Sequence, residues 1–253
     1  MQKIFIEEKN WDKEKNIITI TGEEVNHIKN VLRYKEGNKI ETKIIGEALP
    51  QFLCEIINIE KTEIYCKIIE EMQQNAESSF YLHIIQGLPK SDKMEQIIEK
   101  GTELGVKEFT PLNLKRCITK IDTKEEKKKI ERWQKIALTA AKQCKRNIIP
   151  KINSIHNVKN IFDILEEYDI VIIAYEEEKK QTLKKVLKEY KKNKNIKIAI
   201  LIGPEGGLEK QEVEELIKKG AKAVSLGQRI LRTETVAITL ASILMYELGD
   251  LGG

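Results

Sequence analysis

The chain has 253 residues, of which 41% are hydrophobic and 33% are charged, and its formal net charge is +4. This length accommodates one large domain or two modest ones, and this balance excludes collagen-like, low-complexity and wholly disordered chains. No apolar run approaches the roughly 18 residues of a membrane span, and the acidic N-terminus lacks the apolar stretch of a signal peptide. The four cysteines form no CxxC pair and only three histidines occur, which argues against a disulfide framework and a metal site. We expect a soluble cytoplasmic protein with reduced thiols.

The first 75 residues carry short runs that alternate apolar and polar side chains, which predicts a β-rich segment. The expected strands are Lys3–Ile6, Ile17–Ile20, Lys39–Ile45, Phe52–Ile59 and Glu63–Ile69. One helix interrupts them. Thr21 and Glu24 have the spacing of a capping box, and an apolar stripe follows at Val25, Ile28 and Leu32. A small β-barrel with one helix fits this pattern.

A polar stretch without an apolar run, Glu70–Ser79, is the expected linker to a second region. From residue 80 onwards, apolar strands alternate with amphipathic helices, which indicates a parallel α/β sheet. The expected strands are Tyr81–Gln86, Val106–Thr110, Ile170–Tyr175, Ile196–Ile202 and Ala223–Leu226. The expected helices are Ser91–Leu104, Lys124–Arg146, Gln181–Tyr190, Lys210–Lys219 and Glu234–Leu248. Ser91 is expected to cap the first helix and Gly105 to end it, while Thr233 or Thr235 caps the last.

The positive charge is concentrated in one segment. Residues 115–151 hold 13 basic and 4 acidic side chains, whereas residues 1–80 hold 11 basic and 15 acidic ones. Such a patch points to a polyanion, nucleic acid first, although a solvated lysine-rich helix face gives the same pattern. Only six of the 44 basic residues are arginine, so an arginine here suggests a need for its planar, forked cation.

Two loops are candidates for a ligand site. The strand ending at Ile202 runs into GPEGG (Gly203–Gly207), where glycines allow a close approach of the backbone to a polar ligand. The spacing matches neither common phosphate-binding motif, and a tight strand-to-helix connection is the plain alternative. The stretch SLGQRILRTET (Ser225–Thr235) holds the same position after the next strand, so the two loops are expected to form opposite walls of one pocket. Its Arg229 and Arg232 either act on a substrate or pair with Glu234 or Glu205.

These two motifs together resemble the signature of the SPOUT class of RNA methyltransferases. More narrowly, the chain resembles the ribosomal small subunit RNA methyltransferase E family, which methylates N3 of a uridine in 16S rRNA. Further matching segments in the same order are HIKNVLR (His27–Arg33), KMEQIIEKGTELGV (Lys93–Val106), RWQKIALTAAKQCKRNIIP (Arg132–Pro150) and AYE (Ala174–Glu176). The chain departs from the family at Lys3, where an arginine is expected, at Lys142, where an acid is usual, and at Lys145, where glycine is common.

The resemblance implies a PUA-like β-barrel at residues 1–72 that binds RNA, and a SPOUT α/β domain with a deep trefoil knot at residues 73–253. It also implies S-adenosylmethionine as the cofactor, no metal, a homodimer, and 16S rRNA or the assembled small ribosomal subunit as partner. The implied cofactor-binding residues are Ala174, Tyr175, Glu176, Leu201, Ile202, Gly203, Pro204, Glu205, Gly206, Gly207, Leu226, Gly227, Ile230, Leu231 and Thr235.

Arg232 is the expected catalytic residue, because its guanidinium can stabilise the negative charge that develops on a uridine losing its N3 proton. Arg229 is the competing candidate. The implied RNA-binding residues are Lys3, His27, Arg33, Arg116, Lys142, Gln143, Arg146 and Arg229. Two other functions remain open from the sequence. One is a methyltransferase that acts on a different rRNA or tRNA position, and the other is a non-catalytic RNA-binding assembly protein.

Overall fold

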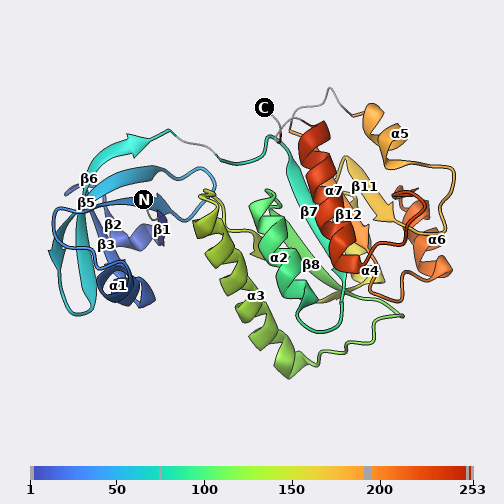
Figure 1. Cartoon of the computed structure of the whole chain (residues 1–253), viewed down its shortest axis with the longest axis horizontal. Helices are drawn as coiled ribbons and strands as arrows, with labels where there is room; N and C mark the ends of the chain where they lie inside the picture. Colours follow the sequence, from blue (N-terminus) through green and yellow to red (C-terminus); the bar gives the residue numbers. More distant parts are fainter. Residues whose placement is uncertain (1–2, 74–75, 191–194, 249–250, 252–253) are drawn as a thin grey trace. The chain divides into compact units, whose positions relative to one another are not determined.

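The computed structural model describes residues 3–73, 76–190, 195–248 and 251. The chain forms two compact units, and each is described by itself below. The first comprises residues 1–77 together with 141–148, and the second comprises residues 78–140 and 149–253. Figure 1 labels most of the helices and strands of both.

The first unit is a curled six-stranded sheet with the strand order β1-β4-β5-β6-β3-β2. Its strands are β1 (Lys3–Ile6), β2 (Trp11–Asp12), β3 (Ile17–Thr21), β4 (Lys39–Ile44), β5 (Gln51–Ile59) and β6 (Glu63–Met72). Strand β1 pairs with β4 in parallel, and the other pairs are antiparallel. All five expected strands are confirmed, and the short β2 was not predicted. Every second side chain of β3 and β6, such as Ile18, Ile20 and Ile64, enters the core of this unit.

The helix after β3 begins without the expected capping box. It consists of α1 (Glu23–Asn26), which continues as a π-helical turn, η2 (His27–Val31). Its N-cap is Gly22, with φ of 71°, and no side chain caps it. Thr21 is the last residue of β3 and pairs with Glu63, so its backbone is extended. The apolar stripe was predicted correctly, because Val25 and Ile28 are buried.

The expected linker is only partly a linker. Strand β6 continues to Met72, so the first part of Glu70–Ser79 is paired in the sheet. Residues 74–75 lie outside the described residues. Glu77 then turns inward, and its carboxylate accepts hydrogen bonds from Arg146 Nη2 at 2.6 Å and from the backbone of Asn147 at 2.8 Å. This contact explains why residues 141–148 group with the first unit, which the sequence pattern did not predict.

The second unit contains a seven-stranded sheet in which every pairing is parallel. Its strands are β7 (Tyr81–Gly87), β8 (Glu108–Asn113), β9 (Lys151–Ile152), β10 (His156–Asn157), β11 (Ile170–Ala174), β12 (Lys197–Ile202) and β13 (Lys222–Val224). The order is β10-β8-β7-β12-β11-β13, and β9 also pairs with β8. The expected parallel α/β sheet is confirmed.

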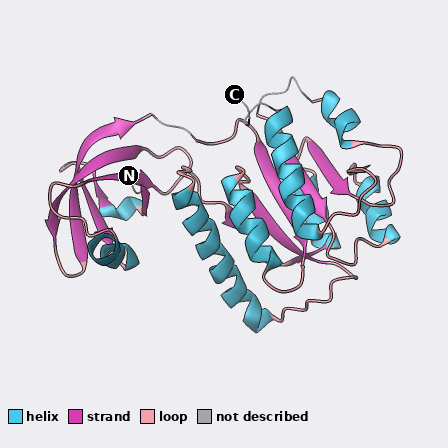
Figure 2. Ribbon diagram, in the orientation of Figure 1, coloured by secondary structure: helices cyan, strands magenta, loops and turns pink. Residues whose placement is uncertain are grey.

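Among the described residues from Tyr81 onwards, six helices lie between or after these strands. They are α2 (Lys93–Glu103), α3 (Thr123–Gln143), α4 (Val158–Leu165), α5 (Leu183–Lys188), α6 (Lys210–Lys218) and α7 (Thr233–Glu247). Figure 2 shows the helices in cyan. Helix α4 was not predicted. Ser91 does not cap α2, because its φ is 55° and the N-cap is Asp92, whereas Gly105 does follow the helix with a positive φ of 89°. Neither threonine caps α7, whose N-cap is Arg232.

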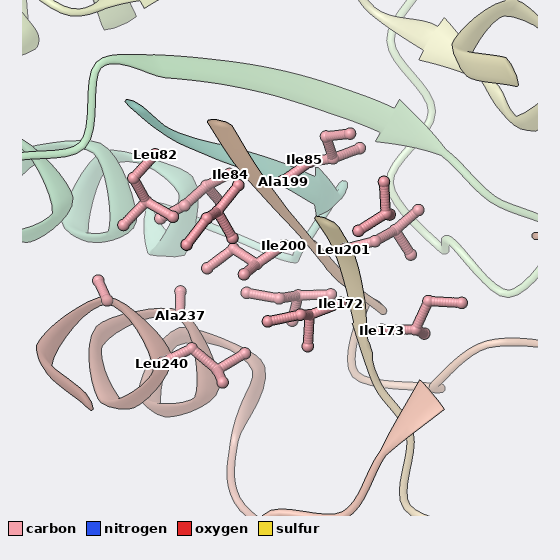
Figure 3. Packing of buried hydrophobic residues seen from close by; sticks show 14 of the residues in the cluster. Leu82, Ile84, Ile85, Ile172, Ile173, Ala199, Ile200, Leu201, Ala237 and Leu240 are labelled. Carbon is pink, nitrogen blue, oxygen red and sulfur yellow. The ribbon is translucent and has the colours of Figure 1, made fainter. Parts of the chain in front are cut away.

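Both faces of the parallel sheet are buried. In register, Ile84, Ile200 and Ile172 form one row across β7, β12 and β11. The next residue of each strand faces the other side, and all six side chains are fully buried. Figure 3 shows Ala237 and Leu240 of α7 on the side of the first row. Helices α2 and α7 lie side by side in Figure 1 and pack against each other. Continuous apolar strands are therefore needed here, since helices cover the sheet.

The strand order creates one switch point in the sheet. From β7 the chain builds outward through β8 to β10, then crosses over and places β12 between β7 and β11. Ligands of open α/β sheets bind at such a point, outside the carboxyl ends of the strands. The carboxyl ends of β7 and β12 lie on either side of it and lead to Gly87 and Gly203. Among the described helices, none is long and apolar enough to cross a membrane.

Candidate active site

The Gly203–Gly207 loop is a tight turn at the carboxyl end of β12. The backbone N–H of Gly207 donates to the carbonyl oxygen of Pro204 at 2.9 Å. A Cβ on Gly203 would lie 2.9 Å from the carbonyl carbon of Gly207, and Gly207 itself has φ of 70°. Both positions therefore need glycine. Gly203 and Pro204 are buried, while Glu205 and Gly206 are exposed.

The end of β11 contributes the second part of the site. Ala174 is half-buried at the end of the strand, and the backbone N–H of Tyr175 donates to the carbonyl of Val224 at 3.1 Å, which ties β11 to β13. The carboxylate of the exposed Glu176 lies against Gly207, where a Cβ on that glycine would clash with it. Glu176 makes no hydrogen bond or ion pair with another described residue, so its charge is available beside the loop. Burial and the nearby Glu177 carboxylate raise the pKa of Tyr175 to about 12, which keeps this phenol neutral.

The loop after β13 forms the third part. None of the backbone N–H groups of Gln228–Arg232 donates a hydrogen bond to a residue in the described ranges. The Ile230 side chain is 82% exposed, which is unusual for isoleucine, and Leu226 and Leu231 are half-buried. Exposed donors and exposed apolar side chains on one short loop are what a flat, polar-edged ligand requires.

Arg229 and Arg232 are both exposed, and neither forms a hydrogen bond or ion pair with the described part of the chain. The alternative pairing with Glu205 or Glu234 is therefore not observed. Lys93 takes both of those carboxylates, with distances of 2.9 Å to Glu205 and 3.4 Å to Glu234. Its hydrogen bond to Glu205 raises the pKa of Lys93. Both arginines are left free to meet a substrate.

Two residues that the sequence reasoning missed join these loops. Gln86 is fully buried at the end of β7, and its Nε2 donates to the hydroxyl of Thr233 at 2.8 Å. That hydroxyl donates to the carbonyl of Gly203 at 2.7 Å. A glutamine at the end of a mostly apolar strand, directly before Gly87, was the signal that could have revealed this link.

Arg116 lies against the outer side of the glycine loop. Its Nη1 donates to the carbonyl oxygen of Gly206 at 3.1 Å, and a Cβ on Gly206 would lie 3.2 Å from the Arg116 Cβ. The neighbouring Lys115 is exposed and pairs with Glu209 at 3.1 Å. This part of the basic segment therefore borders the candidate site within the second unit.

The expected RNA-binding residues of the first unit fall into two groups. Lys3 and Arg146 are 3% and 2% exposed. Lys3 Nζ donates to Asn147 at 2.6 Å and to the carbonyl of Lys145 at 2.9 Å, and burial lowers its pKa. Arg146 pairs with the buried Glu77. These two cations are therefore engaged within the unit, and contact of either with RNA stays a prediction.

The second group lies at the surface of the first unit. Arg33 and Gln143 are exposed, and His27 is half-buried. Lys142 forms an ion pair with Glu24, and its side chain is only 15% exposed. Arg33, Gln143 and His27 are therefore accessible to a partner, whereas Lys142 is largely engaged within the unit.

A separate buried polar cluster lies at the amino end of the parallel sheet. His83 of β7 is fully buried, with Nδ1 2.6 Å from the Tyr168 hydroxyl and Nε2 2.8 Å from the Thr110 hydroxyl. Burial lowers the pKa of His83 to about 4, against the weaker attraction of Glu108. The imidazole is thus neutral near pH 7, and the strands hold it at the opposite end from the glycine loop.

The four cysteines are free, as expected, and burial raises the pKa of Cys54 to about 11 and of Cys66 to about 12. No group of three or more His, Cys, Asp or Glu residues is arranged to hold a metal ion among the described residues.

Comparison with known proteins decides the family. A family model described as an RNA methyltransferase domain matches residues 76–245, and one described as an RNA methyltransferase PUA domain matches residues 20–41. The chain is 38% identical over 252 residues to a ribosomal RNA small subunit methyltransferase E from Bacillus subtilis, covering 98% of this chain and 97% of that protein. The chain belongs to this family.

Two further members of the family support this assignment. A relative of the same name from Buchnera aphidicola is 35% identical, with 91% of this chain and 88% of the relative covered. The crystal structure of the family member from Neisseria gonorrhoeae, bound to S-adenosylmethionine, superposes with a TM-score of 0.84 at 25% identity and covers 99% of both chains. The match thus extends over both units of the chain.

Proposed function

We propose that this chain transfers the methyl group of S-adenosylmethionine to ring nitrogen N3 of a uridine in 16S rRNA of the small ribosomal subunit. One observation carries the proposal: three parallel strands end at one edge of the sheet in the Glu176, Gly203–Gly207 and Gln228–Arg232 segments, beside the switch point. These are the segments that resemble the family's signature, on a chain that belongs to the family over nearly its whole length.

The residues present fit S-adenosylmethionine. The free backbone donors of Gln228–Arg232 suit the adenine edge, and the exposed Ile230 with Leu226 and Leu231 suits its faces. The unpaired carboxylate of Glu176 suits a hydroxyl or a positive charge. When bound, S-adenosylmethionine supplies an activated methyl group. The proposed binding residues remain Ala174, Tyr175, Glu176, Leu201, Ile202, Gly203, Pro204, Glu205, Gly206, Gly207, Leu226, Gly227, Ile230, Leu231 and Thr235, with the buried Leu201 and Ile202 contributing through their backbone.

Arg232 is the proposed catalytic residue. Uridine N3 carries a weakly acidic proton, and its loss places negative charge on the neighbouring carbonyl oxygens. An exposed guanidinium with no ion-pair partner in the described part of the chain can donate to those oxygens without first breaking a contact. Arg229, three residues earlier and equally free, is proposed to orient the RNA. The remaining acceleration comes from holding methyl and nitrogen in line.

RNA binding is proposed to involve both units. Residues 1–72 form the proposed RNA-binding domain, with His27 and Arg33 as its accessible contacts. Residues 73–253 form the proposed methyltransferase domain, which carries the accessible Gln143. In the second unit, Arg116 and the exposed lysines of α3 offer cations for phosphates. Because the substrate is ribosomal RNA, the cytoplasm is the proposed location.

Two further features of the family are proposed for this chain. One is a homodimer in which α7 forms part of the interface, because its Tyr246 is 68% exposed and Val236 and Ile243 are only half-buried. Sedimentation at micromolar concentration tests it, and a monomer there would remove it. The other is a trefoil knot in the second unit, in keeping with the close approach of Thr233 to Gly203 and Gln86.

The experiment is mass spectrometry of modified nucleosides in 16S rRNA from cells with the gene, without it, and with an Arg232→Ala copy. We expect N3-methyluridine only with the active gene. In single-turnover assays, Arg232→Ala should lower the rate by about 10²–10³-fold with unchanged cofactor affinity, and Arg232→Lys should recover part of it. Arg229→Ala, at the residue proposed to orient the RNA, should weaken RNA binding and leave the rate at saturating RNA near that of the wild type. A gene-dependent methylation at another rRNA or tRNA position would show that the chain is a methyltransferase with a different target. If no modification depends on the gene, the chain is the non-catalytic RNA-binding assembly protein.

A further inference from the structure

Gln86 is a fully buried polar residue for which the proposed chemistry has no use. Its Nε2 donates to the carbonyl oxygen of Gly87 at 2.9 Å and to the hydroxyl of Thr233 at 2.8 Å, and it lies 3.4 Å from the carbonyl oxygen of Gly203. The Thr233 hydroxyl completes the network with its own bond to Gly203. One amide therefore joins the end of β7, the start of the glycine loop and the first residue of α7.

The network leaves one atom unpaired. Gln86 Oε1 is buried and accepts no hydrogen bond from any described residue. The surrounding acceptors fix this orientation, because a flipped amide would place Oε1 against the carbonyls of Gly87 and Gly203. An unpaired buried acceptor is destabilising, and an apolar side chain of similar length would avoid that cost. That cost offsets part of the stabilisation from the hydrogen bonds that Nε2 donates, so the net contribution of Gln86 to stability is small.

The place of Gln86 in the sheet gives a reason for glutamine at this position. In register it pairs with Ile202, so it lies at the switch point, one residue before the glycine loop begins on the neighbouring strand. A Cβ on Gly87 would lie 2.7 Å from Pro204, and a Cβ on Gly203 would lie 2.9 Å from the carbonyl carbon of Gly207. A displacement of the Gly203 carbonyl is therefore transmitted through the whole loop. The same amide also fixes Thr233, where the Gln228–Arg232 loop enters α7.

We propose that Gln86 is a positioning residue for S-adenosylmethionine, acting through Gly203 and Thr233. It holds the two loops in their binding arrangement before the ligand arrives, so less ordering has to occur on binding. The inference rests on the proposed function, because that function names the ligand. It adds a residue that does not itself touch the ligand or the reacting atoms.

The test uses Gln86→Met in the full chain, with Gln134→Met as matched control. Gln134 also bridges two backbone groups, donating to Pro150 at 2.9 Å and accepting from Ile152 at 3.2 Å. Gln134 itself lies on α3, and the two backbone groups lie just before and within β9. Calorimetric titration with S-adenosylmethionine and thermal unfolding are measured for each variant. We expect Gln86→Met to bind about tenfold more weakly, equivalent to about 1.4 kcal/mol, with little change in Tm. Gln134→Met should show the reverse, a lower Tm and unchanged affinity.

Variants of Thr233 test the same hydrogen-bond network independently. Thr233→Val should weaken binding as Gln86→Met does, Thr233→Ser should restore it, and the double variant Gln86→Met with Thr233→Val should be little weaker than either single one. Binding by Gln86→Met within twofold of the wild type would overturn the inference while leaving the proposed function intact. Loss of affinity in step with loss of Tm in both glutamine variants would also overturn it. A wild-type chain that binds no S-adenosylmethionine would refute the proposed function itself.

Discussion

Gly207 offers the sharpest test of the glycine loop, because the structure provides a control with the same backbone strain. Its φ is 70°, a region in which an alanine costs about 1–2 kcal/mol. Gly220, at the end of α6, has φ of 92° and nothing within 4 Å of a built Cβ. We expect both Gly207→Ala and Gly220→Ala to lower Tm by about 2–8 °C.

Only Gly207→Ala should affect the cofactor. Its new methyl group would meet the Glu176 carboxylate, and because Glu176 is exposed, that carboxylate can turn away at little further cost in stability. The loop then loses its acidic neighbour and its close turn, so binding of S-adenosylmethionine should weaken by about tenfold or more. Thermal unfolding and calorimetric titration of both variants provide the measurement. Equal affinity in Gly207→Ala, Gly220→Ala and the wild type would refute the reasoning, and Glu176→Gln would show how much of the effect is due to charge.

Three further outcomes are expected. Arg146→Met should lower the free energy of unfolding of the first unit by about 3–5 kcal/mol in a denaturant titration, because it leaves Glu77 buried and charged. Lys13→Met, which breaks the exposed pair with Glu8, is the control and should cost less than about 1 kcal/mol. The folded chain holds the pKa of His83 at about 4 against 6.5 when unfolded, so the unfolded chain binds more protons between these values and stability should fall by up to about 3 kcal/mol as pH drops from 6.5 to 4. An identical pH profile in His83→Asn would show that another group is responsible. Neutralising Lys127, Lys128 and Lys135 of α3 should reduce the slope of log affinity for RNA against log salt concentration by up to ~0.7–0.9 per lost phosphate contact. The same change at Lys179, Lys184 and Lys188 serves as control. Equal slopes in both variants would show that the α3 lysines form a solvated face only.

The sequence by itself predicted most of the local structure and the place of the candidate site. Alternating polarity predicted the strands of the first unit, and continuous apolar runs followed by amphipathic segments predicted the parallel sheet, since both patterns record which faces are buried. The glycine loop and the arginine-bearing loop were found because each follows a strand directly, and parallel strands end at one edge. Local cues for caps were less reliable. Thr21 belongs to a strand and Ser91 takes a positive φ, because neighbouring contacts outweigh capping preferences there.

Tertiary structure decided the contacts between segments that are far apart in the chain. Sequence periodicity does not say that β12 lies between β7 and β11, and so it did not reveal that Gln86 meets Gly203, 117 residues later. Nor did it show that Lys3 and Arg146, which look like surface cations, are buried against Asn147 and Glu77. The physical reason is the same in each case. A polar side chain is buried at little cost only where distant backbone or side-chain groups complete its hydrogen bonds, and those partners exist only once the chain has folded.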